Sequence, residues 1–285
     1  MRKITCWTVG LSMVIITISS CKKKTEDPIP EDPFPESSLL VFRPKKIFVG
    51  PDSAQPKLWA EVVYDELGRV KERITYTEGM LPIIEYIKET RTYTPTLVYV
   101  KRTFLNHGDQ KFYTSGFDSL ILQNDRIVRT ASLYTYQGTA VSGDNTTGVN
   151  TRSTYTYRQG DSLEVDVYRN INYDDQMENV HYTFFKNGRL KGYSTTEEGK
   201  IGPTGSVTIV HYAGINGKFE RGTNPFQIGI EFIDLPTEVH YASAPDFSSV
   251  SYTQWHFDQE KRPVAATVTS KTGSDGTKTY YRFEY

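Results

Sequence analysis

The sequence predicts an all-β protein, an antiparallel meander of β-hairpins with little or no helix after an N-terminal leader. The chain has 20 Tyr and 14 Phe but only 4 Met. Tyrosine suits a half-buried sheet surface, because its ring packs while its hydroxyl reaches water. From about Leu39 onward, short aromatic and β-branched runs alternate with Gly, Asn and Asp clusters. This alternation is typical of strands joined by tight turns.

Residues 1–20 have the layout of a cleaved signal peptide. Two basic residues follow the initiator Met, and a mostly apolar stretch runs from Ile4 to Ile18. This stretch is shorter than the roughly 20 apolar residues that a membrane-spanning helix needs. Small residues precede Cys21 at its end, as at a signal-peptide cleavage site.

The segment Ile18-Ser19-Ser20-Cys21 resembles the lipobox of bacterial lipoproteins, in which a branched apolar residue and two small residues precede a cysteine. The resemblance implies cleavage before Cys21 and lipidation of that cysteine, so we expect the membrane as a partner through the lipid. The alternative is an ordinary secretory leader with an incidental cysteine. Cys6 lies inside the leader, which leaves the mature domain without a thiol for a disulfide, a metal or a nucleophile.

Residues 21–38 are predicted to form a tether between lipid and domain. Three lysines follow Cys21, and then four prolines stand among acidic residues, a composition that favours extended polyproline II. Lys24-Thr25-Glu26-Asp27 resembles the signal that sends lipoproteins of the Bacteroidota to the cell surface. We therefore expect an outer-membrane lipoprotein, with an outward-facing orientation as the finer expectation. Residues 39–285 then form a single β-rich domain.

Pairs of short runs predict hairpins in this domain. In the first pair, Gly68 can adopt the positive φ that tight hairpin turns often need. Four hairpins share one form, in which a strand and a polar turn lead to an arginine and then to an apolar residue. The paired runs are 58–64 with 69–76, 116–122 with 126–128, 182–185 with 189–193, 207–212 with 215–219, and 255–257 with 262–264; the four arginines are Arg69, Arg126, Arg189 and Arg262. Their spacing varies, so the hairpins form no fixed array.

Two further segments carry local predictions. The best helical candidate is 83–91, but Pro82 and the β-branched residues around it argue against a helix. Asn224-Pro225-Phe226 predicts a structural corner, because Pro225 fixes φ and Phe226 begins an alternating apolar run.

Several of these motifs resemble known families. Tyr64-Asp65-Glu66-Leu67-Gly68-Arg69-Val70 resembles the Tyr-Asp repeat of RHS-type proteins, and 184–190 and 257–264 resemble degenerate units of it. The segment 222–226 resembles the Asn-Pro-Phe segment of Tyr-rich Bacteroidota lipoproteins that carry domains of unknown function, such as DUF4595. The resemblance covers about residues 55–285 and implies a β-sheet lipoprotein, but it supplies no catalytic residue.

No motif assigns a catalytic residue, a cofactor or a metal. The chain has no nucleophile elbow, Walker loop or dinucleotide fingerprint. Its five histidines lack the spacing of a zinc hydrolase and are expected on sheet surfaces, with convergence on a metal as the alternative. Polar loops at Asp144-Asn145 and Asp174-Asp175 leave a calcium site open as an alternative. A net charge of −1 argues against nucleic acid as a partner.

The sequence therefore predicts a membrane-anchored, non-enzymatic binding or interaction module. Trp59 and Trp255 are the candidate ligand-binding residues, because aromatic rings on a sheet stack on sugars or pack on protein partners. Their alternative role is to fill the core. A glycan or a protein is the expected partner. The rival function is a glycan-directed hydrolase with carboxylates from separate strands, which a deep pocket holding two facing carboxylates would favour.

Overall fold

The structure is a computed structural model that describes residues 39–77, 84–106, 108–124, 126–137, 146–158, 162–171, 174–184, 189–198, 203–224, 234–243, 247–272 and 275–285. Within these residues all regular structure is β-strand, which confirms the predicted fold class. Sixteen of the described strands form a closed barrel, and β1 and β14 form a small parallel sheet. The leader, Cys21, the tether and the Pro225-Phe226 corner lie outside the described residues.

The strand bounds, in chain order, are as follows. They are β1 Leu40–Phe42, β2 Lys46–Gly50, β3 Lys57–Tyr64, β4 Val70–Tyr76, β5 Ile84–Tyr93, β6 Leu97–Asn106, β7 Phe112–Gln123, β8 Arg126–Gln137, β9 Thr146–Arg158, β10 Ser162–Ile171, β11 Asp174–Phe184, β12 Leu190–Glu197, β13 Gly205–Tyr212, β14 Gly217–Phe219, β15 Pro236–Ser243, β16 Phe247–Phe257, β17 Pro263–Thr272 and β18 Asp275–Glu284.

The barrel wall is the predicted meander. Each wall strand pairs antiparallel with the next one along the chain, and β18 pairs with β2 to close the barrel. At this closure Phe283 lies opposite Ile47. Most of the best helical candidate falls within β5, in keeping with the proline and β-branched residues that argued against a helix there.

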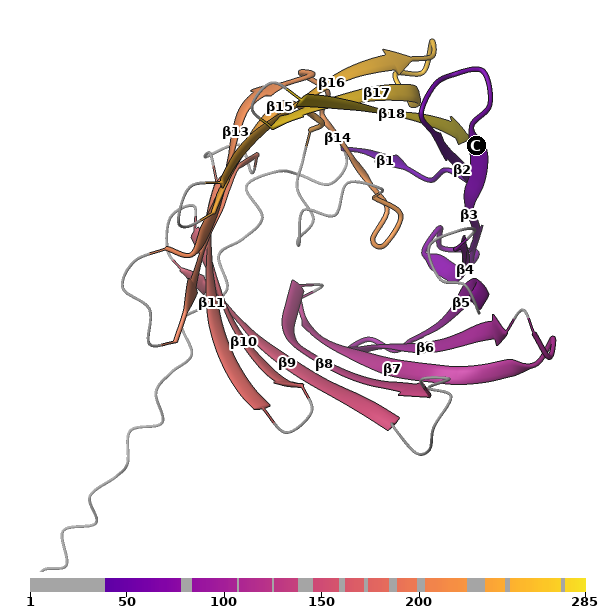
Figure 1. The fold of residues 1–285 in the computed structure, drawn as a ribbon, viewed down its shortest axis with the longest axis vertical. Coiled ribbons are helices and arrows are strands. Elements are labelled where there is room, and N and C mark those ends of the chain that lie inside the picture. The colour runs from indigo at the N-terminus through magenta and orange to yellow at the C-terminus, as the bar shows by residue number, and fades with distance from the viewer. Residues whose placement is uncertain are drawn as a thin grey trace, which may run out of the picture.

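The two ends of the barrel differ. In an antiparallel meander every second connection falls at the same end, so the β3–β4 turn, the β16–β17 turn and the β13–β15 connection share one end. Figure 1 shows β1 and β14 inside the curve of the wall, and we call the end that carries them the inner-sheet end. The β6–β7 hairpin lies at the opposite end, which we call the far end.

The inner sheet packs against one side of the wall. Phe219 of β14 lies 5.6 Å from Phe42 of β1 and 5.4 Å from Phe283 of β18, measured between ring centroids. Ile47 and Ala266 join the same buried cluster. The wall face that carries these residues is therefore the inner face. Directly opposed residues of paired strands share a face, so the strand pairing identifies the inner-facing residues of the other wall strands.

The inner face from β10 to β15 is also apolar. On β10, Leu163, Val165 and Val167 are buried, whereas Glu164 and Asp166 between them face outward. A second buried cluster covers the inner face from β10 to β15; its members are Leu163, Val165, Val167, Val180, Tyr182, Leu190, Val207, Ile209 and Val239. The two buried apolar clusters thus lie on the inner face of the barrel.

The shared hairpin form has a physical basis at the first and last turns. Asp65 accepts hydrogen bonds from the backbone N–H groups of Leu67 and Arg69, and its other oxygen accepts one from Arg69 Nε at 2.8 Å. Asp258 and Arg262 repeat this pattern, also at 2.8 Å. The carboxylate therefore fixes the turn and aims the arginine.

Each of the four hairpin arginines then lies over a tyrosine ring. The pairs are Arg69 with Tyr93, Arg126 with Tyr157, Arg189 with Tyr212 and Arg262 with Tyr285, with the guanidinium carbon 4.3, 5.3, 5.6 and 4.9 Å from the ring centroid. In three pairs the tyrosine hydroxyl also donates to the carbonyl of the apolar residue after the arginine; these bonds join Tyr93 to Val70, Tyr157 to Ile127 and Tyr285 to Pro263. Tyr64 bonds Pro44, the residue after Arg43, in the same way.

These five tyrosines line the inner-sheet end, and we call them the tyrosine rim: Tyr64, Tyr93, Tyr157, Tyr212 and Tyr285. Burial raises the pKa of Tyr64, Tyr93, Tyr212 and Tyr285 above the ordinary tyrosine value. The neutral hydroxyl is thus the form that the folded barrel holds.

The raised pKa values predict alkaline instability. An unfolded tyrosine ionises near about pH 10, so the unfolded chain binds fewer protons than the barrel above that pH, and stability falls as pH rises further. Tyrosinate absorbance should show fewer ionised tyrosines in the native protein than in the urea-unfolded protein at about pH 10.5. Equal ionisation in a protein that is still folded would contradict this prediction.

Candidate functional site

The inner-sheet end is organised around the connection between β13 and β15, which turns into the barrel and forms β14. Two arginines of the inner wall bind its backbone. Arg73 of β4 donates to the carbonyl of Gly222 at 2.8 Å, and Arg91 of β5 donates to the carbonyl of Arg221 at 2.9 Å. Residues about 130 to 150 positions apart in the chain are joined in this way.

Two ion pairs hold the same connection from other sides. Arg43, just after β1, lies 3.4 Å from Glu220, and Arg189, just before β12, lies 2.7 Å from Asp234. Asp234 is fully buried and has a positive φ of 71°. Its second oxygen accepts hydrogen bonds from two backbone N–H groups. Asp234 therefore fixes the point at which the chain leaves the interior.

The wall beside these contacts carries a compact charge network. Glu89 lies 3.4 Å from Arg91 and 2.7 Å from Arg102, and Arg102 also pairs with Asp118. Burial alone would raise the pKa of Glu89, but the surrounding arginines lower it, so the carboxylate stays ionised. This network orders the arginines that hold the inner connection.

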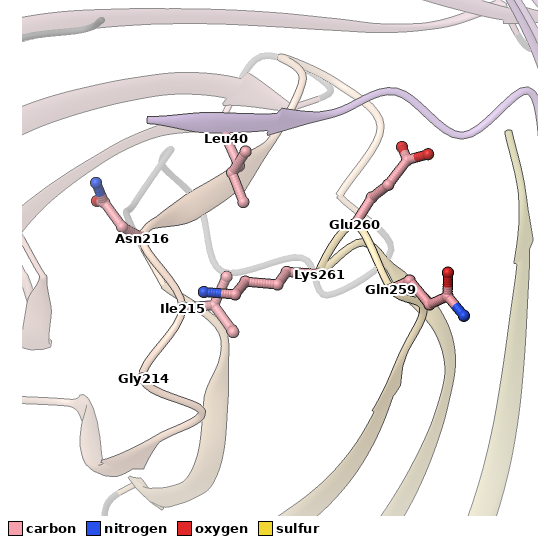
Figure 2. Close-up of a pocket in the computed structure, with 7 residues that line it drawn as sticks. All are labelled: Leu40, Gly214, Ile215, Asn216, Gln259, Glu260 and Lys261. Atoms are coloured by element: carbon pink, nitrogen blue, oxygen red, sulfur yellow. The ribbon is translucent and has the colours of Figure 1, made fainter. Parts of the chain in front are cut away.

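Two open hollows flank this end. The first has a volume of about 440 Å³ and lies between β1, the stretch before β14 and the β16–β17 turn. Figure 2 shows Lys261 reaching toward Ile215, whereas Glu260 and Gln259 point away from it. Glu260 is the single carboxylate among its lining residues.

The second hollow, of about 570 Å³, lies between the β3–β4 turn and the end of β5. Its carboxylates, Asp65 and Glu66, are neighbours in the chain, and Asp65 is bound to Arg69. Neither hollow has the pair of carboxylates from separate strands that the hydrolase alternative requires.

The two candidate tryptophans lie on the inner face. Trp255 stacks on Phe283, with ring centroids 6.4 Å apart, and its Nε1 donates to the carbonyl of Pro236 at 3.0 Å. Trp59 lies under the guanidinium of Arg73 at 5.1 Å. The structure does not bring the two tryptophans together as one surface platform, and their role in ligand binding stays a prediction.

Two of the candidate histidines lie beside one carboxylate. His211 and His240 lie on the outer wall beside Glu238, with nitrogen–oxygen distances of 3.6 and 2.6 Å. Among the described residues, no group of three or more His, Cys, Asp or Glu side chains is placed to hold a metal ion. Asp144, Asn145 and the side chains of Asp174 and Asp175 lie outside the described part.

The outer wall carries aromatic contacts that sequence reasoning did not single out. Tyr99 and Phe117 stack with ring centroids 5.7 Å apart, and Tyr86 meets Phe112 edge-on at 6.0 Å. Phe112 is 58% exposed. The sequence signal was the alternation along each strand, but alternation does not tell which face is inner.

Comparison with known proteins supports the barrel fold. No family model and no curated protein matches the chain. A porin-like protein from Bacteroides vulgatus is similar in structure, with a TM-score of 0.56 at 12% identity over 86% of this chain and 98% of that one. A porin-like protein from Bacteroides uniformis shares 11% identity over the same fractions, with a TM-score of 0.34.

The Bacteroides vulgatus protein is thus a solved structure to which this chain is similar in fold, and membership of the DUF4595 or Tyr-Asp repeat families stays a prediction. The part of the chain that the structure describes contains no helix of the length and apolar character needed to cross a bilayer.

Removing Arg189 tests whether the Arg189–Asp234 ion pair holds the β13–β15 connection in place. Arg189→Ala leaves the fully buried carboxylate of Asp234 without its ion-pair partner, and breaking a buried pair from one side costs about 3–5 kcal/mol. Arg69→Ala, at the matching turn position, leaves only a partly exposed partner and should cost much less.

Chemical denaturation of both variants measures the difference. Adding Asp234→Asn to Arg189→Ala should restore part of the lost stability, because the amide removes the unpaired charge and asparagine tolerates positive φ. Equal losses in Arg189→Ala and Arg69→Ala would show that the pair does not hold the connection.

Proposed function

We propose that this chain is a lipid-anchored, non-enzymatic binding module of the outer membrane, and that its barrel stands in water instead of spanning the bilayer. The polarity of the wall carries this proposal. Charged pairs lie on the outer face around the barrel, including Glu72 with Lys88 at 2.8 Å and Glu164 with Arg158 at 2.6 Å. The two clusters of buried apolar residues lie on the inner face.

A membrane-spanning barrel needs the opposite arrangement. Its strands alternate apolar side chains toward lipid with polar ones toward a water-filled lumen. An arginine or lysine facing the middle of the bilayer costs about 2–4 kcal/mol. The outer face of this barrel carries such residues on many strands; examples are Lys46, Lys88, Lys101, Arg152, Lys271 and Arg282. Water is therefore the better surrounding for this wall.

The inner wall also argues against a diffusion channel. Val98, Val100 and Val165 are each at most 4% exposed on the inner face, so these parts of the wall do not line a water-filled passage. The porin-like neighbours support an outer-membrane location, and the lipobox at Cys21 supports anchoring by lipid. The Lys24 to Asp27 segment supports outward orientation on the cell surface.

The absence of ion conduction is the direct test of a water-exposed barrel. The full-length protein in detergent, added to planar lipid bilayers beside a general porin as positive control, should give no stepwise conductance. The reason is that the outer charges oppose insertion and the inner face is packed. Discrete conductance steps from this protein, in an assay in which the general porin also conducts, would refute the proposal.

Lipid attachment is tested separately. Cells grown with a clickable palmitate analogue should label the wild-type protein and leave Cys21→Ser unlabelled, because the acyl chains are expected on Cys21 and on its new amino group. Cys6→Ser is the matched control and should label normally, since Cys6 lies in the removed leader. Label retained in Cys21→Ser would place the anchor elsewhere.

A further inference from the structure

An aromatic row crosses four strands on the outer wall at the far end. Tyr76 of β4 pairs with Tyr86 of β5, Tyr86 pairs with Leu105 of β6, and Leu105 pairs with Phe112 of β7. Directly opposed residues share a face. Tyr76 lies on the outer face, because its neighbour Thr75 is opposite the inner residue Ala60. We call these four residues the outer aromatic row.

The outer aromatic row contains one strongly exposed ring. Tyr86 lies 6.0 Å from both Tyr76 and Phe112, measured between ring centroids. Leu105 is only 8% exposed, although it faces outward, whereas Phe112 is 58% exposed. The row thus has its own buried base, and its accessible apolar surface is concentrated at Phe112.

Polar side chains lie beside the outer aromatic row. Tyr76 donates to Glu61 at 2.7 Å, and Gln110 donates to Glu85 at 3.4 Å. Burial, together with Glu61, Tyr86 and Glu85, raises the pKa of Tyr76 to about 12. Carboxylate and amide groups can each make several hydrogen bonds, so the border suits a ligand with many hydroxyls.

We propose that the outer aromatic row is a carbohydrate-binding site, in which a sugar ring packs on Phe112 and its hydroxyls bond to Glu85 and Gln110. A protein partner fits less well, because a stable protein interface buries about 800 Å² on each side, and the exposed apolar surface here is chiefly one ring. This inference rests on the proposed binding function and names its ligand class.

The position of the row agrees with this role. The chain enters the domain at β1, which lies at the inner-sheet end. A lipid tether that joins there leaves the far end, with the β6–β7 hairpin and the row, pointing away from the membrane. A glycan in the surrounding medium can reach it without meeting the lipid surface.

Affinity electrophoresis of the full-length protein in detergent tests the site, with gels that contain laminarin, xylan, mannan or starch. At least one polysaccharide should slow the wild-type protein. Phe112→Ala should weaken that binding about tenfold or more through loss of the packed ring, and Glu85→Gln should also weaken it. Tyr252→Ala is the matched control, because Tyr252 is an aromatic residue 42% exposed on the outer face of β16, and should bind as the wild type does.

Three results would overturn the site: no retardation by any of the four polysaccharides, full binding by Phe112→Ala, or an equal loss in Tyr252→Ala. Should Phe112→Ala fail to fold, Glu85→Gln decides alone, since Glu85 is exposed and its replacement removes no packing. Shortening of a polysaccharide would contradict the non-enzymatic function but leave the binding site standing. Conductance in bilayers would contradict the water-exposed barrel, whatever the glycan result.

Discussion

The width of the barrel is the constraint on which the rest of this structure depends. Side chains alone can fill a barrel of about eight strands, whereas barrels of 16–18 strands enclose a channel unless something occupies it. This barrel has sixteen strands in its described wall and apolar residues on its inner face. Such a face must be covered from within, and the inner sheet of β1 and β14 covers the side between β16 and β3.

Arginine side chains hold the backbone of the β13–β15 connection inside the barrel. A connection that turns inward brings carbonyl groups that need hydrogen-bond donors. Arg73 and Arg91 provide donors from the wall, and Arg43 and Arg189 pair with acidic residues of the connection. Guanidinium groups suit this task because they offer several donors in a fixed plane and keep their charge.

The arginines of the hairpin turns pair with carboxylates in two different ways. In the first and last turns an aspartate four residues earlier holds the arginine, as at Asp65 and Asp258. Phe185 occupies that position before Arg189, and Arg189 pairs instead with Asp234 of the inner connection. A turn arginine without an aspartate in its own turn thus pairs with an aspartate of the β13–β15 connection.

The strands and turns could be predicted from sequence because their causes are local. The strand within 69–76 and the tight turn at Gly68 depend on neighbouring residues, and the structure bears them out. The β2–β18 closure and the inner sheet could not be predicted, because they join residues such as Ile47 and Phe283 that are distant in the chain. The sequence also did not distinguish the inward Trp255 from the outward Phe112, since alternation does not say which face is inner.

The β2–β18 pairing has a consequence for how the barrel forms. The first and last wall strands of the sheet meet each other, so the ring cannot close until the final strand has been synthesised and has paired. Contacts of such long sequence separation form slowly, since the intervening chain must be ordered first. Until then β2 and β18 are both unpaired edges that invite association with other chains. We expect folding of this domain to depend on protection of these edges until the barrel has closed.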